Sequence, residues 1–188
     1  MQKFLIAGLG NIGAEYELTR HNVGFLIADA LAEELKTEFK TDRLASRAEG
    51  SFRGRKVVII KPSTYMNLSG TALRYWLQQE KVETKNSMTL VDDLALPFGE
   101  IRIKGSGSDA GHNGLKNIQE VMGTQKYARL RFGIGNDYPK GRQVDYVLGQ
   151  WKEEEIKALP ERLQKCCEAM KEFMLGGLDE AMNKYNGK

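Results

Sequence analysis

The sequence is poor in the side chains that build disulfides and metal sites. It contains two cysteines and two histidines in 188 residues, and the cysteines, Cys166 and Cys167, are adjacent. Neighbouring cysteines in a helical stretch are poorly placed to pair with each other. The sequence also has no CxxC pair and no local cluster of metal ligands. We therefore expect no metal and a reducing, cytoplasmic setting.

Long apolar runs are missing as well. No stretch approaches the ~20 apolar residues that a membrane-spanning helix needs, and the apolar run after Lys3 is too short for a signal peptide. The hydrophobic content of 41% and the charged content of 28% are typical of an ordinary soluble protein. We expect one domain over residues 1–188, large enough for a full core and without a membrane segment.

Positive charge is concentrated in one part of the chain. The net charge of the whole protein is only +3, whereas residues 100–142 carry eight basic and four acidic side chains, a local excess of +4. A basic face suggests an anionic partner such as nucleic acid. An ordinary solvated surface would explain the same charges, and charge alone does not separate the two.

Hydrophobic periodicity predicts strands and helices in alternation. Strands are expected at 3–8, on both sides of 53–54 within 46–60, at 88–92, 100–104 and 129–135, with a strand or extended connector at 144–148. Helices are expected at 23–35, 71–79, 115–122 and 153–174, followed by a short one after 176–177. This order predicts an α/β fold, a single three-layer domain whose mixed, mostly parallel sheet is flanked by helices, with the C-terminal helices beginning at about residue 153.

Local signals refine these boundaries. Asn22 and Ser69 are the expected N-caps of the first two helices. Pro62 is expected to end its strand, because proline cannot donate to a sheet ladder. Pro160 is the weak point of the long C-terminal helix.

A glycine-rich GxGxxG motif, Gly8–Gly13, follows the first strand. A dinucleotide site also needs a helix that opens within the glycines and an acidic residue that ends the second strand ~20 residues later. Here no helical pattern starts before Asn22, and the acids at the right distance, Glu33 and Glu34, fall inside the expected helix. The dinucleotide hypothesis is therefore weak, and titration with NAD would test it. Walker A and GxSxG sequences are absent.

The segment Ser63–Leu68 lies between an expected strand and an expected helix, at the carboxyl end of the strand. Ligands of open α/β sheets bind at such ends. Tyr65 and Met66 offer apolar surface, and Asn67 offers both a donor and an acceptor. A long loop that packs on itself would explain the segment equally well.

Both histidines are followed at once by an asparagine and are expected in loops. His21 has a possible partner in Asp92, which should end a neighbouring strand at the same sheet edge. A carboxylate orients an imidazole, whose other nitrogen can then deprotonate water. Amides of Asn11, Asn67 and Asn113 could fix a substrate or donate to an oxyanion. With no obvious Ser or Cys nucleophile, these residues indicate attack of water on an acyl carbon, although a lone histidine is more often structural.

Taken together, these stretches resemble the bacterial-type peptidyl-tRNA hydrolase family. In chain order, the matching pieces are Gly8–Gly13, Tyr16, Thr19–Asn22, Lys61–Gly70, Asp92, Leu96-Pro97, Gly99, Gly111–Lys116, Arg129–Arg131, Gly133–Gly135 and Tyr146–Leu148. The block Lys61–Gly70 is highly specific, whereas the first glycine motif alone is weak.

The resemblance implies an enzyme that cleaves the ester between a peptide and the 3′ ribose of tRNA, and so rescues tRNA from aborted translation. It implies that His21 is the general base and Asp92 its orienting partner. Asn11 and Asn67 would position the substrate and help the oxyanion.

The remaining expectations concern substrate contacts. By the same resemblance, Tyr16 and Met66 would line the cleft, and Asn113 would hold the peptide or the CCA end. Lys104 and Arg131 would grip tRNA phosphate, while His112 would be a loop residue rather than a second base. We expect no cofactor, and we expect a monomer because no apolar stripe is obviously left over.

The sequence departs from the family pattern at three places. Ala110 stands where the family usually has glycine, so a left-handed backbone there would force the loop to rearrange. Asp93 replaces the usual glutamate after Asp92, and the segment 136–142 is longer than usual. A non-catalytic RNA-binding relative on the same scaffold is the main alternative, and the five intact polar residues of the expected site argue against it.

Overall fold

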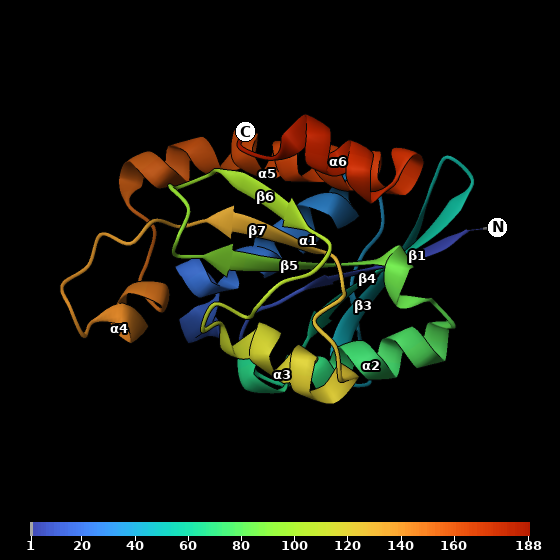
Figure 1. The fold of residues 1–188 in the computed structure, drawn as a ribbon, viewed down its shortest axis with the longest axis horizontal. Helices are drawn as coiled ribbons and strands as arrows, with labels where there is room; N and C mark the ends of the chain where they lie inside the picture. Colours follow the sequence, from blue (N-terminus) through green and yellow to red (C-terminus); the bar gives the residue numbers. More distant parts are fainter. Residues whose placement is uncertain (1) are drawn as a thin grey trace.

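A seven-stranded sheet runs through the centre of the computed structural model, which describes residues 2–188 (Figure 1). Residue 1 of the expected domain lies outside the described residues. The strands are β1 (Lys3–Gly8), β2 (Lys40–Asp42), β3 (Ala45–Phe52), β4 (Arg55–Pro62), β5 (Ser87–Asp93), β6 (Ile101–Lys104) and β7 (Arg129–Gly133), in the spatial order β2-β3-β4-β1-β5-β7-β6. The central strands β4, β1, β5 and β7 are parallel, and the outer pairings are antiparallel. The predicted mixed sheet is confirmed.

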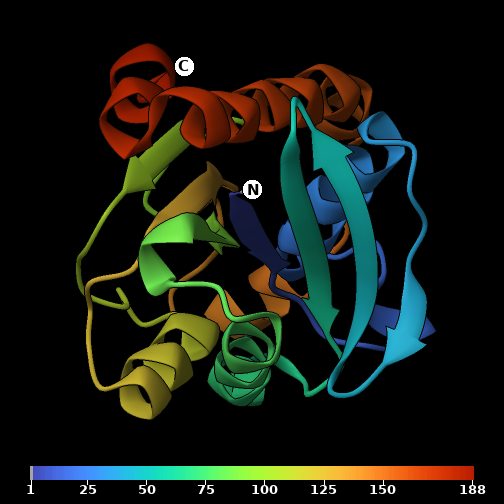
Figure 2. The same ribbon diagram turned by 90° about the vertical axis from the view of Figure 1, so that its right-hand side faces the viewer.

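Helices cover both faces of this sheet (Figure 2). The helices α1 (Val23–Glu34), α5 (Glu153–Gly176) and α6 (Leu178–Tyr185) lie on one face, and α2 (Ser69–Glu80) and α3 (Asn113–Met122) lie on the other. Because successive strand residues point to opposite faces, Ile6 packs in the first core and Leu5 in the second. The predicted three-layer architecture is confirmed.

Pro62 ends its strand, whereas Pro160 does not end its helix. Pro62 is the last residue of β4, as predicted. Pro160 lies inside α5, yet the helix continues to Gly176. The buried residues beyond it, Met170 and Phe173 among them, pack α5 on the sheet core. This tertiary packing compensates for the hydrogen bond that an internal proline removes.

The segment expected to be a strand or connector at 144–148 is a short helix, α4 (Gln143–Val147), so that prediction is wrong. Its apolar alternation does not mark burial, because Val144 is 67% exposed. The helix is instead held by Arg20, whose Nη1 donates to the carbonyl oxygen of Tyr146 at 3.1 Å. Tertiary contacts outweigh the local preference for extended backbone.

Of the two predicted N-caps, Asn22 occupies the N-cap position of α1, whereas Ser69 does not cap α2, whose N-cap is Leu68. Asn22 precedes α1, but its side chain makes no capping hydrogen bond and reaches Asn11 instead. Ser69 is the first residue of α2 and donates from Oγ to the carbonyl oxygen of Met66 at 2.8 Å. The exposed strand β2 was not foreseen, because its three residues carry no hydrophobic pattern.

Glycines of the first motif and of α1 let the helix lie directly against the sheet backbone. A Cβ at Gly24 would be 2.5 Å from the carbonyl oxygens of Leu9 and Leu90, and one at Gly8 would be 2.2 Å from that of Gly24. No helix starts within the motif, since α1 begins only at Val23. The motif therefore serves helix–sheet packing and lacks the helix that dinucleotide binding requires.

The two cysteines are buried in α5 and form no disulfide, as expected from their adjacency. Burial raises the pKa of both thiols, that of Cys167 to about 12. They are therefore unreactive core residues. Among residues 2–188, no helix is both long enough and apolar enough to cross a membrane.

The close approach of α1 predicts a sensitive position. Gly24→Ala should lower the free energy of unfolding by about 1–3 kcal/mol, because the added methyl group overlaps two backbone oxygens. Denaturant unfolding followed by circular dichroism would measure this. The exposed Glu33→Ala on the same helix is the control and should stay within about 0.5 kcal/mol. Equal midpoints for both variants would contradict the packing argument.

Candidate active site

The polar residues of interest meet at the carboxyl ends of the parallel strands, as predicted. Asn11 follows β1, the short 3-10 helix η3 (Met66–Leu68) follows β4, and Asp92 lies at the end of β5. His21 belongs to a second short helix, η2 (Arg20–Asn22), directly before α1. Segments distant in the sequence thus supply one site.

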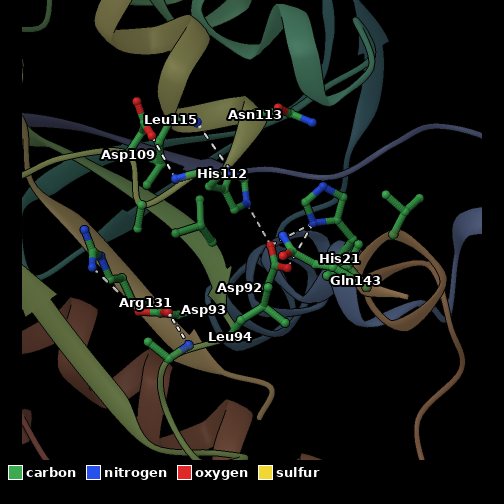
Figure 3. Close-up of a pocket in the computed structure, with 16 residues that line it drawn as sticks. His21, Asp92, Asp93, Leu94, Asp109, His112, Asn113, Leu115, Arg131 and Gln143 are labelled. Carbon is green, nitrogen blue, oxygen red and sulfur yellow. Dashed lines mark hydrogen bonds and ion pairs between the residues drawn. The ribbon is translucent and has the colours of Figure 1, made fainter. Parts of the chain in front are cut away.

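His21 and Asp92 form a hydrogen-bonded pair. Nδ1 of His21 lies 3.0 Å and 2.9 Å from the two carboxylate oxygens of Asp92. The Asp92 side chain is 2% exposed and that of His21 is 12% exposed. Nε2 of His21 is not engaged by the carboxylate and points away from it (Figure 3). This arrangement leaves one nitrogen available to accept a proton.

The electrostatics of the pair favour a charged imidazole. Burial lowers the pKa of His21, but the charge and hydrogen bond of Asp92 outweigh burial, and the pKa lies above its ordinary value. For Asp92, burial raises the pKa, but the neighbouring His21 and His112 outweigh it and hold that pKa far below its usual range. Asp92 is therefore ionised at neutral pH and stabilises the protonated form of His21.

His112 is a third member of this cluster, which the sequence interpretation missed. It lies in the loop before α3, as expected, but its Nε2 is 2.8 Å from Oδ1 of Asp92 (Figure 3). Its Nδ1 accepts hydrogen bonds from the backbone N–H groups of Gly114 and Leu115 and so caps α3. The available signal was a histidine directly before a helical pattern, at a sheet edge that also holds a carboxylate.

His21, Asp92 and His112 could also hold a metal ion, because their ligand atoms lie within 4.8 Å of one another. The sequence showed no such cluster, since the three residues are far apart along the chain. However, a metal on Nε2 of His112 would require a hydrogen on Nδ1 of the same neutral ring. The N–H groups of Gly114 and Leu115 already point at that Nδ1. The hydrogen bonding therefore fits proton transfer better than metal binding.

Asn11 is held rigidly on two sides. Its side-chain oxygen accepts from the N–H of Met66 at 2.7 Å. Its backbone N–H and carbonyl are both bonded to the Asn22 side chain, each at 2.8 Å. Because the oxygen is engaged, the side-chain NH₂ of Asn11 is the group left to donate to a ligand. Asn22 therefore braces Asn11 rather than capping a helix.

A cavity of about 200 Å³ opens beside the cluster. Its lining includes His21, Asp92, His112, Asn113, Arg131 and Val144. Asn113 is thus placed at a cavity, as expected of a residue that holds substrate. Three other expected substrate contacts do not line it: Tyr16 in η1 (Ala14–Tyr16), and Met66 and Asn67 in η3.

The η3 segment combines burial with backbone strain. Met66 is 4% exposed and packs in the core beside α2 and α3, while Asn67 is exposed. Tyr65 is 51% exposed and has a φ of 59° with a ψ of 160°, a sparsely populated conformation that costs a non-glycine residue roughly 1–3 kcal/mol. The hydrogen bond from Met66 to Asn11 offsets part of this cost.

The two residues expected to contact phosphate differ in exposure. Lys104 is exposed at the end of β6, whereas Arg131 is buried. Arg131 lies 3.6 Å from Asp93 and donates to the carbonyl oxygen of Ser108 at 3.1 Å. Both basic side chains approach Gly107. Asp93, which stands where the family usually has glutamate, is therefore the ion-pair partner of Arg131.

Ala110 adopts the left-handed conformation that the family's glycine would suit, with a φ of 51°. The alanine bears the strain of this conformation, about 1 kcal/mol.

Arg20 is a further residue that the sequence interpretation did not single out. Its guanidinium lies 4.1 Å from the centre of the Tyr146 ring and 3.6 Å from Glu155. The Glu155 side chain also accepts a hydrogen bond from the backbone N–H of Lys152 at the start of α5. Arg20 thereby joins α4, a wall of the cavity, to the segment that carries His21. Hydrophobic periodicity does not predict that Arg20, next to His21 in the sequence, is buried.

Comparison with known proteins agrees with this geometry. A family model described as peptidyl-tRNA hydrolase matches residues 5–188. The peptidyl-tRNA hydrolase of Phocaeicola vulgatus is 55% identical over 186 residues, which cover 99% of this chain and 100% of that protein. The relative from Porphyromonas gingivalis is 54% identical over 98% of this chain and 100% of its own length. The crystal structure of peptidyl-tRNA hydrolase from Acinetobacter baumannii superposes with a TM-score of 0.91 at 32% identity, covering 97% of this chain and 94% of that one.

Removing the charge of Asp92 should reverse the upward shift in the pKa of His21. In Asp92→Asn, burial remains while the attraction of the carboxylate is lost, so the pKa of His21 should fall below its ordinary value. NMR titration of the ring protons would measure this, since the chain has only two histidines. The exposed Glu17→Gln is the control and should leave the titration unchanged. An unaltered His21 titration in Asp92→Asn would show that the pair does not set the pKa.

Proposed function

Because the chain belongs to the peptidyl-tRNA hydrolase family, we propose that it cleaves the ester between a peptide and tRNA by means of a water molecule that His21 activates. The products are free tRNA and a peptide with a free carboxylate. The observation that carries the proposal is the pairing of His21 with the buried Asp92, which leaves Nε2 of His21 available as a base.

The proposed reaction has two steps. Nε2 of His21 takes a proton from water while the water oxygen attacks the ester carbonyl carbon, and Asp92 stabilises the imidazolium that results. The carbonyl oxygen becomes an oxyanion, to which the side-chain NH₂ of Asn11 donates. The bond between that carbon and the ribose 3′ oxygen then breaks, and the imidazolium returns its proton to the leaving oxygen.

The two amide contacts are assigned by their position near the carboxyl ends of the parallel strands. Asn113 lines the cavity beside His21, and Asn67 is exposed on η3, where its amide can bind the peptide backbone. Tyr16 and Met66 would contribute apolar surface, the buried Met66 mainly by shaping the loop. Lys104 is the basic residue best placed for tRNA phosphate, and Arg131 supports it by anchoring the loop at Ser108.

We further infer that residues 1–188 act as one hydrolase domain, monomeric, in the cytoplasm and without a cofactor. The balanced composition and the two unpaired cysteines support this setting. The hydrogen-bonding pattern of His112, which opposes metal binding, supports a reaction that needs only protein groups and water.

The assignment of the base predicts the effect of its removal. His21→Ala should lower the release of tRNA from an N-blocked aminoacyl-tRNA by at least about 100-fold, because proton abstraction from water is lost. Thermal unfolding and tRNA affinity should stay close to wild type. Turnover close to wild type would refute the role of His21. A wild-type protein that binds tRNA tightly without releasing it would favour the non-catalytic RNA-binding alternative.

The phosphate contact predicts a change in salt dependence. Lys104→Ala should weaken tRNA binding and reduce the slope of log affinity against log salt by about 1, the value for one phosphate contact. Hydrolysis of a short RNA-free ester should be unaffected. The matched control is Lys157→Ala, an exposed lysine on α5. A loss of equal size on the RNA-free ester would exclude a role in gripping phosphate.

A further inference from the structure

His112 is a largely shielded titratable group that the proposed reaction does not use directly. Its side chain is 9% exposed, and both ring nitrogens are engaged. Nε2 lies 2.8 Å from Oδ1 of Asp92, and Nδ1 faces the backbone N–H groups of Gly114 and Leu115 at 3.1 Å and 3.4 Å. Two independent elements, the sheet and α3, therefore constrain one ring.

These contacts define where the ring hydrogen lies. Nδ1 accepts from two N–H donors, so it carries a lone pair and no hydrogen. The single hydrogen of the neutral ring is then on Nε2, from which it points at Asp92. His21 has the opposite pattern, because its Nδ1 carries the hydrogen toward the carboxylate and its Nε2 is free. The amino end of α3 thus selects the tautomer of His112.

We propose that His112 is a positioning residue, a neutral hydrogen-bond donor whose tautomer is fixed by α3 and which holds the Asp92 carboxylate in place for His21. Oδ1 of Asp92 accepts from both rings, so the carboxylate cannot rotate without breaking one of the two bonds. The inference rests on the proposed role of His21 as base. It assigns no contact between His112 and the reacting atoms.

The donor also adjusts how strongly Asp92 attracts the His21 proton. A carboxylate that shares its charge with a second N–H holds an imidazolium less tightly. The other charged groups that face the cluster are Asp93 and Arg131 from the sheet and Asp109 from the loop before α3. Arg20, on η2, points away toward Glu155. The α4 wall contributes only uncharged side chains to the lining.

Two substitutions separate this role from simple helix capping. In His112→Asn the side-chain oxygen can replace Nδ1 as the N-cap acceptor, since asparagine is among the best caps, but the shorter side chain does not reach Asp92. In His112→Gln the side-chain NH₂ can replace Nε2 as the donor to Asp92, while the cap is lost. Glu120→Gln, at an exposed site on α3, is the matched control.

The experiment measures kcat, KM and their pH dependence on N-blocked aminoacyl-tRNA, together with thermal unfolding. We expect His112→Asn to retain the melting temperature and to lose about 10- to 100-fold in kcat with little change in KM, because Asp92 is no longer oriented. The acid limb of its kcat–pH profile should move to higher pH, since the unshared charge of Asp92 holds the His21 proton more strongly. His112→Gln should melt at a lower temperature but keep the wild-type acid limb and more of kcat.

The kinetics and stability of the two His112 variants distinguish a positioning role from a helix-cap role. Wild-type kcat and pH dependence in His112→Asn would overturn the proposal and leave His112 as a helix cap. Loss of kcat in both variants, in proportion to lost stability, would overturn it too. Failure of the proposed function is seen separately, as unaltered turnover in His21→Ala.

The tautomer itself can be observed. Nitrogen-15 NMR of the wild-type imidazoles above neutral pH should show the hydrogen on Nε2 of His112 and on Nδ1 of His21. Because the chain has two histidines, the spectrum of His112→Asn assigns both. A hydrogen on Nδ1 of His112 would overturn the proposal.

Discussion

The charge of one buried carboxylate organises the site. Asp92 is almost completely removed from water, and an isolated charge in that position would be strongly unfavourable. Two imidazoles remove that penalty by hydrogen bonding to it from η2 and from the loop before α3. The same contacts that make the charge tolerable therefore fix where the base lies. Stability of the sheet edge and preparation for proton transfer have one physical origin.

Backbone proximity brings these groups together. Gly24 allows α1 to lie against the carbonyls of Leu9, directly after β1, and of Leu90 in β5, so η2, which is continuous with α1, lies against the end of the strand that carries Asp92. Asn22 then ties η2 to the loop after β1, and Asn11 ties that loop to η3. The asparagines form a chain of specific hydrogen bonds from one strand end to the next. A site assembled from loops is rigid here because each loop is bonded to its neighbour.

The sequence predicted what depends on periodic burial: the central strands, the long helices, the layers and the edge where His21 meets Asp92. Sequence-based prediction failed where a contact with a residue distant in the sequence determines the local structure or the side-chain partner. Residues 143–147 form a helix that Arg20 holds, and the Asn22 side chain, at the N-cap position of α1, bonds to Asn11 instead of to the helix. The contact of His112 with Asp92 and the pairing of Arg131 with Asp93 were not foreseen. Such pairings depend on three-dimensional register, which local patterns do not encode.

The two cysteines have a practical consequence. Both thiols are buried in α5, and their raised pKa keeps them protonated under ordinary labelling conditions. A cysteine introduced at Val144, which is highly exposed on the cavity wall, would be the only thiol in the folded chain that a maleimide could reach. Dyes or spin labels can thus be attached beside the pocket with the native cysteines left in place, so the pocket can be probed in an otherwise unaltered protein.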